Sequence, residues 1–445
     1  MKKSFIKWIS VLFFILFLGA GFALWGASAQ HTKSIYEDLK NFSDVLSLIQ
    51  ENYVDEILSQ DLIKGAIRGM MGTLDPHSQY MEKEEYNDLK VQTKGEFGGL
   101  GIVVTIKDNL LTVISPIEDT PAFKAGIMAG DRIVKIEDEY TKDMTLYEAI
   151  GKMRGESGTK INISIYREGH ADLIQFTLIR AKIPMVSVKY HMVKDNVGYI
   201  KISEFKSKTG EELEKALKDL EKQGMQSLVL DLRHNPGGLL NVAVEVANKF
   251  ISRGRLIVYT KGRIEGQNMQ FFADKEPSHP NFPLVILVNM GSASASEIVA
   301  GAVQDWNRGA LVGTKTFGKG SVQSIIPLGE SGASGLRLTT AKYYTPSGRC
   351  IHGEGIMPDI NIEMSTDQQL KIYKQESEEE NIKVNEKQRQ YLKDTIDSTS
   401  VELRQKPEEQ KNNEIEKVSD IQLDIAVDIL KAQYLFTKSK FESLL

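Results

Sequence analysis

Two short apolar runs, each followed by a turn of small residues and then by an amphipathic helix, constrain the fold of this chain most strongly. Turns bound both runs, which is typical of buried strands. The two strands and the two helices expected after them cover Gln226–Leu232, Leu284–Val288, Leu239–Ile251 and Ala295–Asn307. Strands and helices alternate in this way from residue 186 to about residue 363, which predicts an α/β unit.

The residues from Phe97 to about Ile183 have a different character, because Gly-rich turns separate short strands of alternating apolar residues. The strands that we expect cover Gly101–Ile106, Leu111–Ile114, Arg132–Ile136, Lys160–Tyr166 and Ile174–Arg180. Two short helices are predicted among them, over Pro121–Gly126 and Leu146–Met153. The pattern predicts a compact domain built mainly of β-strands.

Helical patterns flank these two units. Residues 35–93 are predicted to be mostly helical, with a second helix over Asp61–Thr73, because apolar residues recur at helical spacing at Leu39, Phe42, Val45, Leu46 and Ile49. The tail from residue 366 to residue 445 is highly charged, which is typical of a solvated helix or a partly disordered linker. Near its end, an apolar stripe that could dock on a partner or on the body comprises Ile421, Ile425, Val427, Ile429 and Leu430.

An apolar run from Trp8 to Trp25 follows three lysines, and no Asp, Glu, Lys or Arg occurs between Lys7 and Lys33. A basic flank before an apolar stretch is typical of an export signal. Small residues suit cleavage after Ala29, but the run is also nearly long enough to stay as a membrane anchor. Both alternatives place the rest of the chain outside the cytoplasm, in a periplasm or at the outer face of the cytoplasmic membrane.

The composition excludes several classes of protein. The 445 residues carry a formal net charge of −5, whereas nucleic-acid binders usually show a basic footprint. A single cysteine rules out an internal disulfide and a Cys-rich zinc site. The seven histidines show no metal-binding spacing, so we expect neither a metal nor another cofactor.

The turn Gly291–Glu297 lies between the second apolar strand and its helix. Such a turn presents a side chain at the helix N-terminus, where backbone N–H groups are free. A serine there can be a nucleophile whose oxyanion these groups stabilise. The alternative is an N-cap serine with Glu297 completing a capping box, and the segment alone does not decide between the two.

The segment Gly313–Gln323 almost matches the phosphate-binding loop GxxxxGK[ST], but Gly320 stands where the motif needs Ser or Thr. The β-like residues after Lys319 also disfavour a nucleotide site. A serine nucleophile needs a general base, and a lysine can serve when burial lowers its pKa. Lys319 has apolar neighbours and no adjacent carboxylate, and Gln323, four positions on, could orient its amine from the same strand face.

Other catalytic pairs are disfavoured by their context. Two serine–lysine pairs have SxxK spacing but lie in or beside strand-like or turn segments: Ser157/Lys160 and Ser203/Lys206. A Ser-His-Asp site lacks a GxSxG motif, and its histidine would be one of His77, His234 and His352. Cys350 lies two residues from His352 on one extended segment, which is not how a Cys–His pair is usually assembled.

Two glycine-rich segments could supply further backbone N–H groups. Asp231–Gly238 closes the first apolar strand, and its Gly-Gly pair is either a tight turn or a second oxyanion donor. Gly99–Ile102 opens the β domain, where it is either a plain strand start or a loop that holds a peptide carboxylate. The later segment Ala125–Ile133 favours the carboxylate interpretation.

Together these segments resemble the C-terminal processing proteases, also called tail-specific or carboxy-terminal serine proteases (peptidase family S41), from about residue 38 to about residue 363. The motifs that carry the resemblance are Leu74-Asp75-Pro76-His77-Ser78, Gly99–Ile102 with Ala125–Ile133, Asp231–Gly238, Gly291–Glu297 and Thr316–Gln323. The last two together are very specific.

The resemblance implies a mixed α+β and α/β multidomain fold. The segments expected are a signal peptide or membrane anchor (1–29), a helical N-terminal region (30–94), a PDZ domain (95–183), a crotonase/ClpP-like α/β protease core of S41 type (184–365) and a charged helical tail (366–445). A homodimer formed through helical regions is also implied, by analogy with related enzymes.

The resemblance further implies a role for individual residues. Ser294, rather than Ser292 or Ser296, would be the nucleophile, with Lys319 as general base and Gln323 as the residue that orients it. The oxyanion hole would comprise the N–H groups of Ala295 and of Gly238, with Gly237 as the alternative to Gly238. The PDZ residues implied in substrate binding are Gly99, Leu100, Gly101 and Ile102, together with Arg154, which would couple PDZ occupancy to the active form.

The function implied is an exported serine endopeptidase that captures proteins with free C-termini and cleaves them through an acyl-enzyme. It would process or degrade extracytoplasmic proteins without a cofactor, and an uncleaved N-terminal segment would attach it to the membrane. The rival is a PDZ scaffold with a dead protease site. A scaffold has no reason to keep Ser294, Lys319 and Gln323 together.

Overall fold

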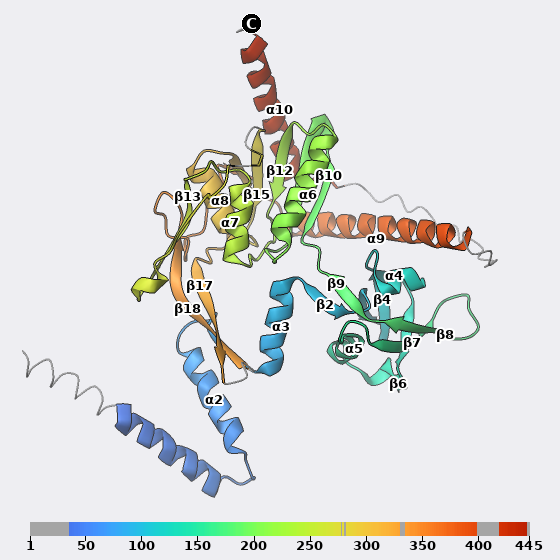
Figure 1. The fold of residues 1–445 in the computed structure, drawn as a ribbon, viewed down its shortest axis with the longest axis vertical. Helices are drawn as coiled ribbons and strands as arrows, with labels where there is room; N and C mark the ends of the chain where they lie inside the picture. Colours follow the sequence, from blue (N-terminus) through green and yellow to red (C-terminus); the bar gives the residue numbers. More distant parts are fainter. Residues whose placement is uncertain (1–34, 277, 280–281, 330–333, 398–417, 443–445) are drawn as a thin grey trace, which may run out of the picture.

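The structure is a computed structural model that describes residues 35–276, 278–279, 282–329, 334–397 and 418–442 (Figure 1). Within these ranges, no helix combines the length and the apolar character that crossing a bilayer requires. The expected signal or anchor, with its apolar run Trp8–Trp25, lies outside the described residues.

A six-stranded sheet forms the core of the α/β unit. Its order is β10-β11-β12-β15-β16-β19, and every pair is parallel except β10 with β11. The strands cover Val188–Met192, Val197–Ile202, Ser227–Asp231, Leu284–Val288, Ala310–Gly313 and Ile360–Asn361. The two strands expected from the apolar runs are thus the central pair β12 and β15, and both are completely buried.

Helices cover both faces of this sheet, because successive side chains of each strand point to opposite faces. Leu228 and Leu230 of β12 pack in the cluster that also holds residues of α6 (Thr209–Lys222), α7 (Leu240–Asn248) and α8 (Ala295–Asp305). Val229 packs in a second cluster, with α10 (Ile421–Glu442).

The apolar stripe near the C-terminus therefore docks on the body of the protein, rather than being left exposed for a partner protein. The buried residues of α10 are Gln422, Ala426 and Leu430, whereas Ile421 is 46% exposed. Of the other predicted stripe residues, Leu430 is buried in the contact, and Ile425, Val427 and Ile429 pack partly buried against the same cluster, so the stripe is confirmed except at Ile421.

A second sheet of five strands carries an elongated hairpin of β17 (Ser321–Leu328) and β18 (Ser334–Tyr344). β18 also pairs with β13 (Leu256–Gly262) and with the short strand β1 (Gln79–Met81). β13 in turn pairs with β14 (Gln270–Phe272). β1 lies between two N-terminal helices, α2 (Ser59–Gly72) and α3 (Lys83–Lys94), and a further helix covers residues 35–52. The N-terminal region is therefore joined to the hairpin by strand pairing.

The β-rich unit forms a separate lobe beside the core (Figure 1). Its strands are β3 (Ile102–Lys107), β4 (Leu110–Pro116), β5 (Arg132–Ile136), β6 (Glu139–Tyr140), β7 (Lys160–Tyr166) and β8 (Ile174–Ile179). Its helices are α4 (Pro121–Ala125) and α5 (Leu146–Met153). A two-stranded ribbon of β2 (Glu96–Gly99) and β9 (Ala181–Pro184) connects this lobe to the rest of the chain.

The charged tail begins as a single long helix, α9 (Thr366–Asp397), that runs from the core to the β-rich lobe (Figure 1). Gln388 is 2% exposed and donates to the carbonyl oxygens of Phe123 and Ile127, at 2.9 and 2.8 Å. Lys387 pairs with Glu118 of the same lobe at 2.9 Å. This helix is therefore more than a solvated segment, because it joins two units of the fold.

Candidate active site

Three loops at one edge of the parallel sheet form the candidate site. They follow β12, β15 and β16, so they come together because the carboxyl ends of parallel strands share an edge. Residues 232–239 form the glycine loop, residues 289–294 the serine loop and residues 314–320 the lysine loop.

Ser294 occupies the sharp turn between the serine loop and α8. Its backbone has φ 55° and ψ −110°, a conformation that residues with a side chain rarely adopt and that costs free energy. Its N–H donates to the Glu297 carboxylate at 2.8 Å. The strain is held by the buried surroundings, and such strain is concentrated at functional sites.

The three serines of this segment differ in their hydroxyl groups. Ser292 and Ser296 are both 0% exposed, and their hydroxyls donate to the carbonyl oxygens of Leu232 and Asn235, at 2.7 and 3.0 Å. Ser294 is 9% exposed, and its hydroxyl donates to no residue that the structure describes. Ser292 and Ser296 thus brace the two loops, whereas Ser294 has a hydroxyl that is available for chemistry.

The glycine loop touches Ser294 through Gly237. A Cβ atom at Gly237, whose φ is +104°, would lie 2.7 Å from the Cβ of Ser294 and 2.9 Å from the nitrogen of Ala295. The N–H of Gly237 is already bonded to the Asn235 side chain at 2.9 Å. The N–H groups of Gly238 and Ala295 have no acceptor among the described residues. This favours Gly238 over Gly237 as a donor to an oxyanion.

Glu297 joins the serine loop to the lysine loop. One carboxylate oxygen accepts the N–H groups of Ser294 and Lys319, at 2.8 and 2.9 Å, and the other accepts Thr316 Oγ1 and the N–H of Gly318, at 2.6 and 2.7 Å. Burial raises the pKa of Glu297 above its ordinary value, although the four donors oppose this shift. The sequence indicated only a capping role. The signal for more was a carboxylate among the small and apolar residues that make up the first two turns of α8.

Lys319 is half-buried, and its amine makes no hydrogen bond or ion pair with the described residues. Burial lowers its pKa, the charge of Arg337 lowers it further, and Glu297 acts in the opposite direction. A Cβ at Gly320 would lie 2.1 Å from the backbone nitrogen of His352, so Ser or Thr does not fit there. β17 follows directly, where a phosphate-binding loop needs a helix.

Gln323 makes no hydrogen bond with Lys319 among the described residues. Its amide donates to Ser321 Oγ at 2.8 Å and to Thr339 Oγ1 at 3.4 Å. A β-bulge between Val322 and Gln323 interrupts the alternation of faces. The prediction that Lys319 and Gln323 share one strand face holds only for a regular strand without such a bulge.

The loop Leu74–Ser78 reaches the lysine side from the N-terminal region. The Asp75 carboxylate accepts the N–H of His77 and both the N–H and the hydroxyl of Ser78, at 2.8 to 2.9 Å. Arg337 of β18 donates to the carbonyl oxygen of His77 at 3.1 Å. Burial lowers the pKa of His77, and the nearby charge of Lys319 lowers it further. This loop motif was recognised from the sequence, but its position beside Lys319 was not.

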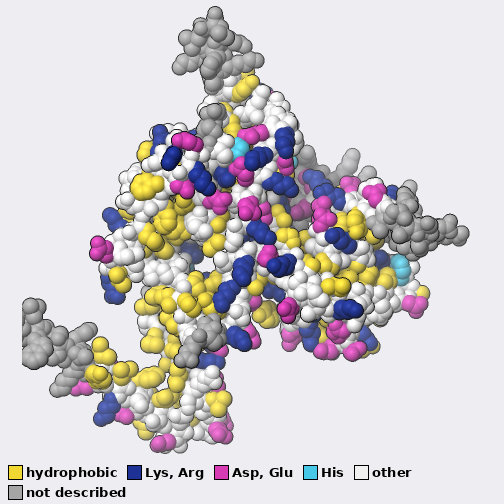
Figure 2. Space-filling model, viewed as in Figure 1, with side chains coloured by type: hydrophobic (Ala, Val, Ile, Leu, Met, Phe, Trp, Pro, Cys, Tyr) yellow, Lys and Arg dark blue, Asp and Glu magenta, His cyan; other side chains and the backbone are white. Residues whose placement is uncertain are grey.

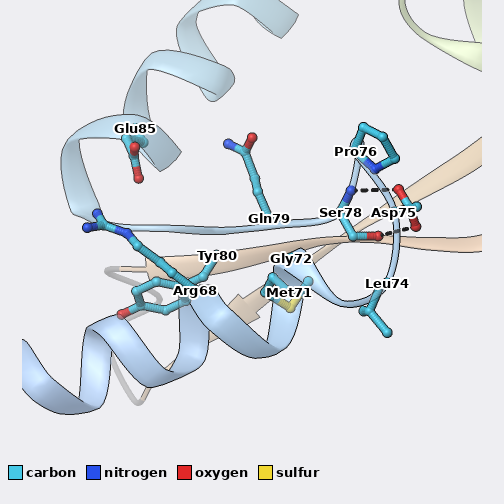
Figure 3. A pocket seen from close by; sticks show the side chains of 10 residues that line it. All are labelled: Arg68, Met71, Gly72, Leu74, Asp75, Pro76, Ser78, Gln79, Tyr80 and Glu85. Atoms are coloured by element: carbon cyan, nitrogen blue, oxygen red, sulfur yellow. Dashed lines mark hydrogen bonds between the residues drawn. The ribbon is translucent and has the colours of Figure 1, made fainter.

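The same loop borders an open hollow of about 490 Å³ between α2, α3 and β1 (Figure 3). Asp75 and Ser78 lie at one end of it, and Arg68 and Glu85 lie towards the other. Arg68 shares the Glu82 carboxylate with Lys64, at 2.6 and 2.7 Å, and every residue that lines the hollow lies between residues 68 and 85. The hollow is therefore a feature of the N-terminal region rather than the centre of the site.

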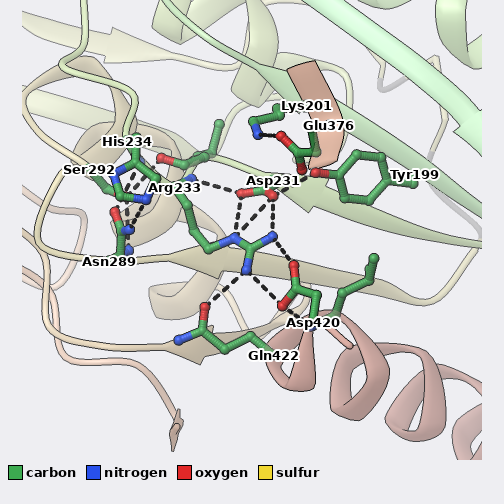
Figure 4. A network of polar contacts seen from close by, with 12 residues as sticks. Tyr199, Lys201, Asp231, Arg233, His234, Asn289, Ser292, Glu376, Asp420 and Gln422 are labelled. Atoms are coloured by element: carbon green, nitrogen blue, oxygen red, sulfur yellow. Dashed lines mark hydrogen bonds and ion pairs between the residues drawn. The ribbon is translucent and has the colours of Figure 1, made fainter. Parts of the chain in front are cut away.

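The glycine loop begins at a buried cluster of charges (Figure 4). Arg233 donates to both carboxylate oxygens of Asp231, and Tyr199 donates to the same carboxylate at 2.7 Å. Burial opposes the ionisation of Asp231, but the charge of Arg233 and the hydrogen bonds outweigh it and hold the pKa below its ordinary value. Asp420 contacts the other side of Arg233.

Three residues of the rival pairs make other contacts. Ser203 donates to the carbonyl oxygen of Ser187 at 3.3 Å, and the amine of Lys206 pairs with Glu204 at 3.2 Å. His234 is bonded to the Asn289 side chain at 2.9 Å. The Lys206 amine is therefore engaged by a carboxylate, and Ser203 by a backbone carbonyl, rather than by each other.

The β-rich lobe has the expected glycine loop at the start of β3. The N–H groups of Leu100 and Gly101 have no acceptor among the described residues. A Cβ at Gly101 would lie 2.3 Å from Thr120, which explains the glycine. Arg154 lies elsewhere, at the end of α5, where it stacks on Phe97 and lies 3.9 Å from Asp88 of α3.

Comparisons with known proteins agree on one family. Residues 196–362 match peptidase family S41, residues 98–178 a PDZ domain, and residues 24–85 the N-terminal domain of the activating protease CtpB. The carboxy-terminal-processing protease of Bartonella bacilliformis is 45% identical over 371 residues, 82% of this chain and 85% of that protein. The carboxy-terminal processing protease CtpB of Bacillus subtilis is 35% identical over 340 residues, 76% of this chain and 70% of that protein.

A solved structure, the photosystem II D1 C-terminal processing protease, is 30% identical and covers 72% of this chain and 92% of its own, with a TM-score of 0.42. The family assignment rests on the sequence relatives. They show that the chain is a serine peptidase. It belongs to the carboxy-terminal processing proteases of peptidase family S41, and it carries a PDZ domain. The predicted fold class, an α/β S41 core combined with a PDZ domain, is confirmed.

Proposed function

We propose that this protein is an endopeptidase in which Ser294 and Lys319 form the catalytic dyad. The observation that carries the proposal is the difference among the three serines. The hydroxyls of Ser292 and Ser296 donate hydrogen bonds to the glycine loop. The hydroxyl of Ser294 is available, and the N–H groups of Gly238 and Ala295 are unpaired among the described residues.

The chemistry follows from these positions. A neutral Lys319 accepts the proton of Ser294 as the hydroxyl attacks a peptide carbonyl. The N–H groups of Gly238 and Ala295 stabilise the oxyanion, usually the largest single contribution to catalysis. Lys319 then protonates the leaving amine, and water hydrolyses the acyl-enzyme. The lowered pKa of Lys319 supports this role, because a lysine base must lose its proton near neutral pH.

The PDZ domain is proposed to bind the free C-terminal end of a protein substrate at Gly99–Ile102. The unpaired N–H groups of Leu100 and Gly101 are suited to a carboxylate, and the edge of β3 can pair with an extended peptide. Arg154 is proposed to couple this binding to the active form. Its contact with Asp88 supports a role at the junction of the PDZ domain and α3 rather than at the dyad.

We further propose that the chain acts outside the cytoplasm, either released after Ala29 or anchored by residues 8–25. A homodimer through the N-terminal helices is proposed as well. The helix over residues 35–52 exposes apolar side chains, visible at the lower left of Figure 2, which include Leu39, Phe42, Val45 and Ile49. Exposed apolar faces of this kind are typical of protein interfaces.

The test is cleavage of an unfolded protein substrate by purified variants. Ser294→Ala is expected to abolish cleavage and retain the melting temperature. Ser292→Ala and Ser296→Ala are expected to lower stability, because each removes a buried hydrogen bond between the serine segment and the glycine loop, but to keep turnover in the folded protein. Wild-type turnover by Ser294→Ala, with loss in Ser292→Ala, would place the nucleophile at Ser292 instead.

A further inference from the structure

The first residues of the C-terminal helix α10 contact Arg233, which lies at the start of the glycine loop. Asp420, the residue before the helix, accepts two hydrogen bonds from the Arg233 guanidinium, at 3.0 and 2.7 Å. Gln422 accepts a third, at 3.1 Å. Figure 4 shows both side chains pointing from α10 to the arginine. A residue 187 positions later in the chain thus contacts the start of the glycine loop.

Arg233 is 6% exposed and has a partner on every nitrogen of its guanidinium group. Asp231 occupies one side of it, and Asp420 with Gln422 occupies the other. Bidentate pairs between arginine and carboxylate fix the orientation of the guanidinium plane as well as its position. The side chain of Arg233 therefore has one well-defined place between β12 and α10.

Asp420 is itself held from the helix side. Its carboxylate accepts the N–H of Leu423 at 3.1 Å, as an N-cap residue does, and its carbonyl oxygen accepts the N–H of Asp424 at 2.8 Å. Ala426 and Leu430 anchor the helix on the sheet. Asp420 is thus anchored to α10 on one side and to Arg233 on the other.

The glycine loop runs from Arg233 to the proposed oxyanion donor Gly238. Neighbouring residues on each side of Arg233 are bonded to the serine loop: Leu232 accepts Ser292 Oγ at 2.7 Å, and the N–H of His234 donates to Asn289 at 2.9 Å. Arg233 thus lies between two residues whose hydrogen bonds join the glycine loop to the serine loop that carries Ser294.

We propose that Asp420, assisted by Gln422, is a positioning residue for peptide hydrolysis. It holds Arg233, and through it the glycine loop, in the place where the N–H of Gly238 can stabilise the oxyanion. This inference rests on the proposed function of Ser294 and Gly238. It assigns a catalytic purpose to the C-terminal helix, which is otherwise a structural layer of the fold.

The test compares Asp420→Ala and Asp420→Asn with the control Asp428→Ala, an exposed carboxylate on the same helix. We measure kcat and KM with a peptide substrate and the inhibition constant of a peptide aldehyde, whose tetrahedral adduct requires the oxyanion hole. Asp420→Ala is expected to lower kcat about 10- to 100-fold, part of the effect of losing one oxyanion donor. KM should stay within about twofold, since substrate binding is not altered.

The aldehyde should bind more weakly by the same factor as the fall in kcat/KM. Asp420→Asn keeps one acceptor for Arg233 and the size of the side chain, so it should recover part of the activity and provides a folded variant if alanine does not fold. Asp428→Ala should match the wild type. Wild-type kcat in folded Asp420→Ala or Asp420→Asn, whatever their melting temperatures, would overturn the proposal and leave Asp420 a stabilising contact only.

Hydrogen exchange at residues 232–239 separates this inference from the proposed function, because it needs no turnover. Faster exchange in Asp420→Ala, but not in Asp428→Ala, supports the hold on the glycine loop. Unchanged exchange overturns it even if the enzyme is inactive. Failure of the proposed function would instead be seen as turnover that survives Ser294→Ala.

Discussion

The serine side and the lysine side of the candidate site are built in different ways. On the serine side, the glycine and serine loops lie within the core and are joined by buried hydrogen bonds, such as the 3.0 Å bond from the N–H of Ala293 to Asn235. On the lysine side, Lys319 and Gln323 lie at the root of the hairpin β17–β18. There the lysine amine has no described partner, and Gln323 is bonded to other residues.

This difference teaches which part of the site can move. Displacing the serine side breaks buried hydrogen bonds and core packing, so it costs a large share of the free energy of unfolding. On the lysine side, the buried Glu297 carboxylate holds the backbone of the lysine loop, but the Lys319 amine has no described partner, and the hairpin also depends on the pairing of β18 with β1 and on the loop Leu74–Ser78. We therefore expect rearrangement on this side to involve the Lys319 side chain and the hairpin and to leave the core folded.

The largest effect is expected on the lysine side, from loss of the base itself. Lys319→Ala should lower kcat about 10³-fold or more, because the hydroxyl of Ser294 is a weak nucleophile without a base. Lys315→Ala is the matched control, since Lys315 is an exposed lysine in the same loop. Single-turnover cleavage of a peptide measures both. If Lys319→Ala retains activity, the general base lies elsewhere, and the lysine side does not supply the base for Ser294.

The next effect tests the rigidity of the serine side. Gly237→Ala places a methyl group 2.7 Å from Ser294 Cβ, whereas Gly224→Ala meets nothing within 4 Å. Both glycines have positive φ, so both substitutions carry the left-handed strain of about 1–2 kcal/mol. Gly237→Ala alone should also lower kcat about 100-fold, because the proposed oxyanion donors are displaced. Equal kcat values in the two variants would contradict a rigid serine side.

Much of the fold could be predicted from the sequence because its signals are local. The strands Leu284–Val288, Arg132–Ile136 and Lys160–Tyr166 and the helix Leu146–Met153 have the bounds expected from periodicity and caps. The proposed nucleophile and base each lie in a short motif, but the choice of Ser294 over Ser292 and Ser296 rests on the resemblance to the protease family. Their chemical roles remain proposals.

The rest could not be predicted, because it depends on residues that are distant in the sequence. Arg337 contacts His77 across 260 positions, and Asp420 contacts Arg233 across 187. Neither contact leaves a periodic pattern. The bulge that separates Gln323 from the expected face is equally invisible, because an extra residue in a strand looks like any other residue.

A smaller effect is expected from the charge of Arg337. Lys319 must be neutral to act as a base, so activity should rise with pH through its lowered pKa. Burial is the main cause of that lowered pKa, and Arg337 is the second, while Glu297 opposes both. Arg337→Met should therefore shift the rising limb of the kcat profile to higher pH, with a loss of about 10-fold or less at neutral pH that is recovered at alkaline pH.

The matched control for this shift is Arg253→Met, an exposed arginine away from the site. Its profile should coincide with that of the wild type. Because Arg337 also holds the carbonyl oxygen of His77, a loss of activity that is equal at every pH would mean that the loop Leu74–Ser78 has moved and that the charge is unimportant.

The smallest effect is expected at Gln323, and it sharpens the view that the lysine side rearranges. We propose that Gln323 leaves Ser321 and Thr339 to orient the amine of Lys319 when substrate binds. Gln323→Ala should then lower kcat by about 10-fold or less, as loss of orientation costs less than loss of the base. Ser321→Ala removes the competing partner at 2.8 Å, so it should keep or raise kcat by shifting the population to the active arrangement. If Ser321→Ala lowers kcat as much as Gln323→Ala does, the hydrogen bond between Gln323 and Ser321 is the one that catalysis needs. Gln323 then supports the hairpin without moving to Lys319.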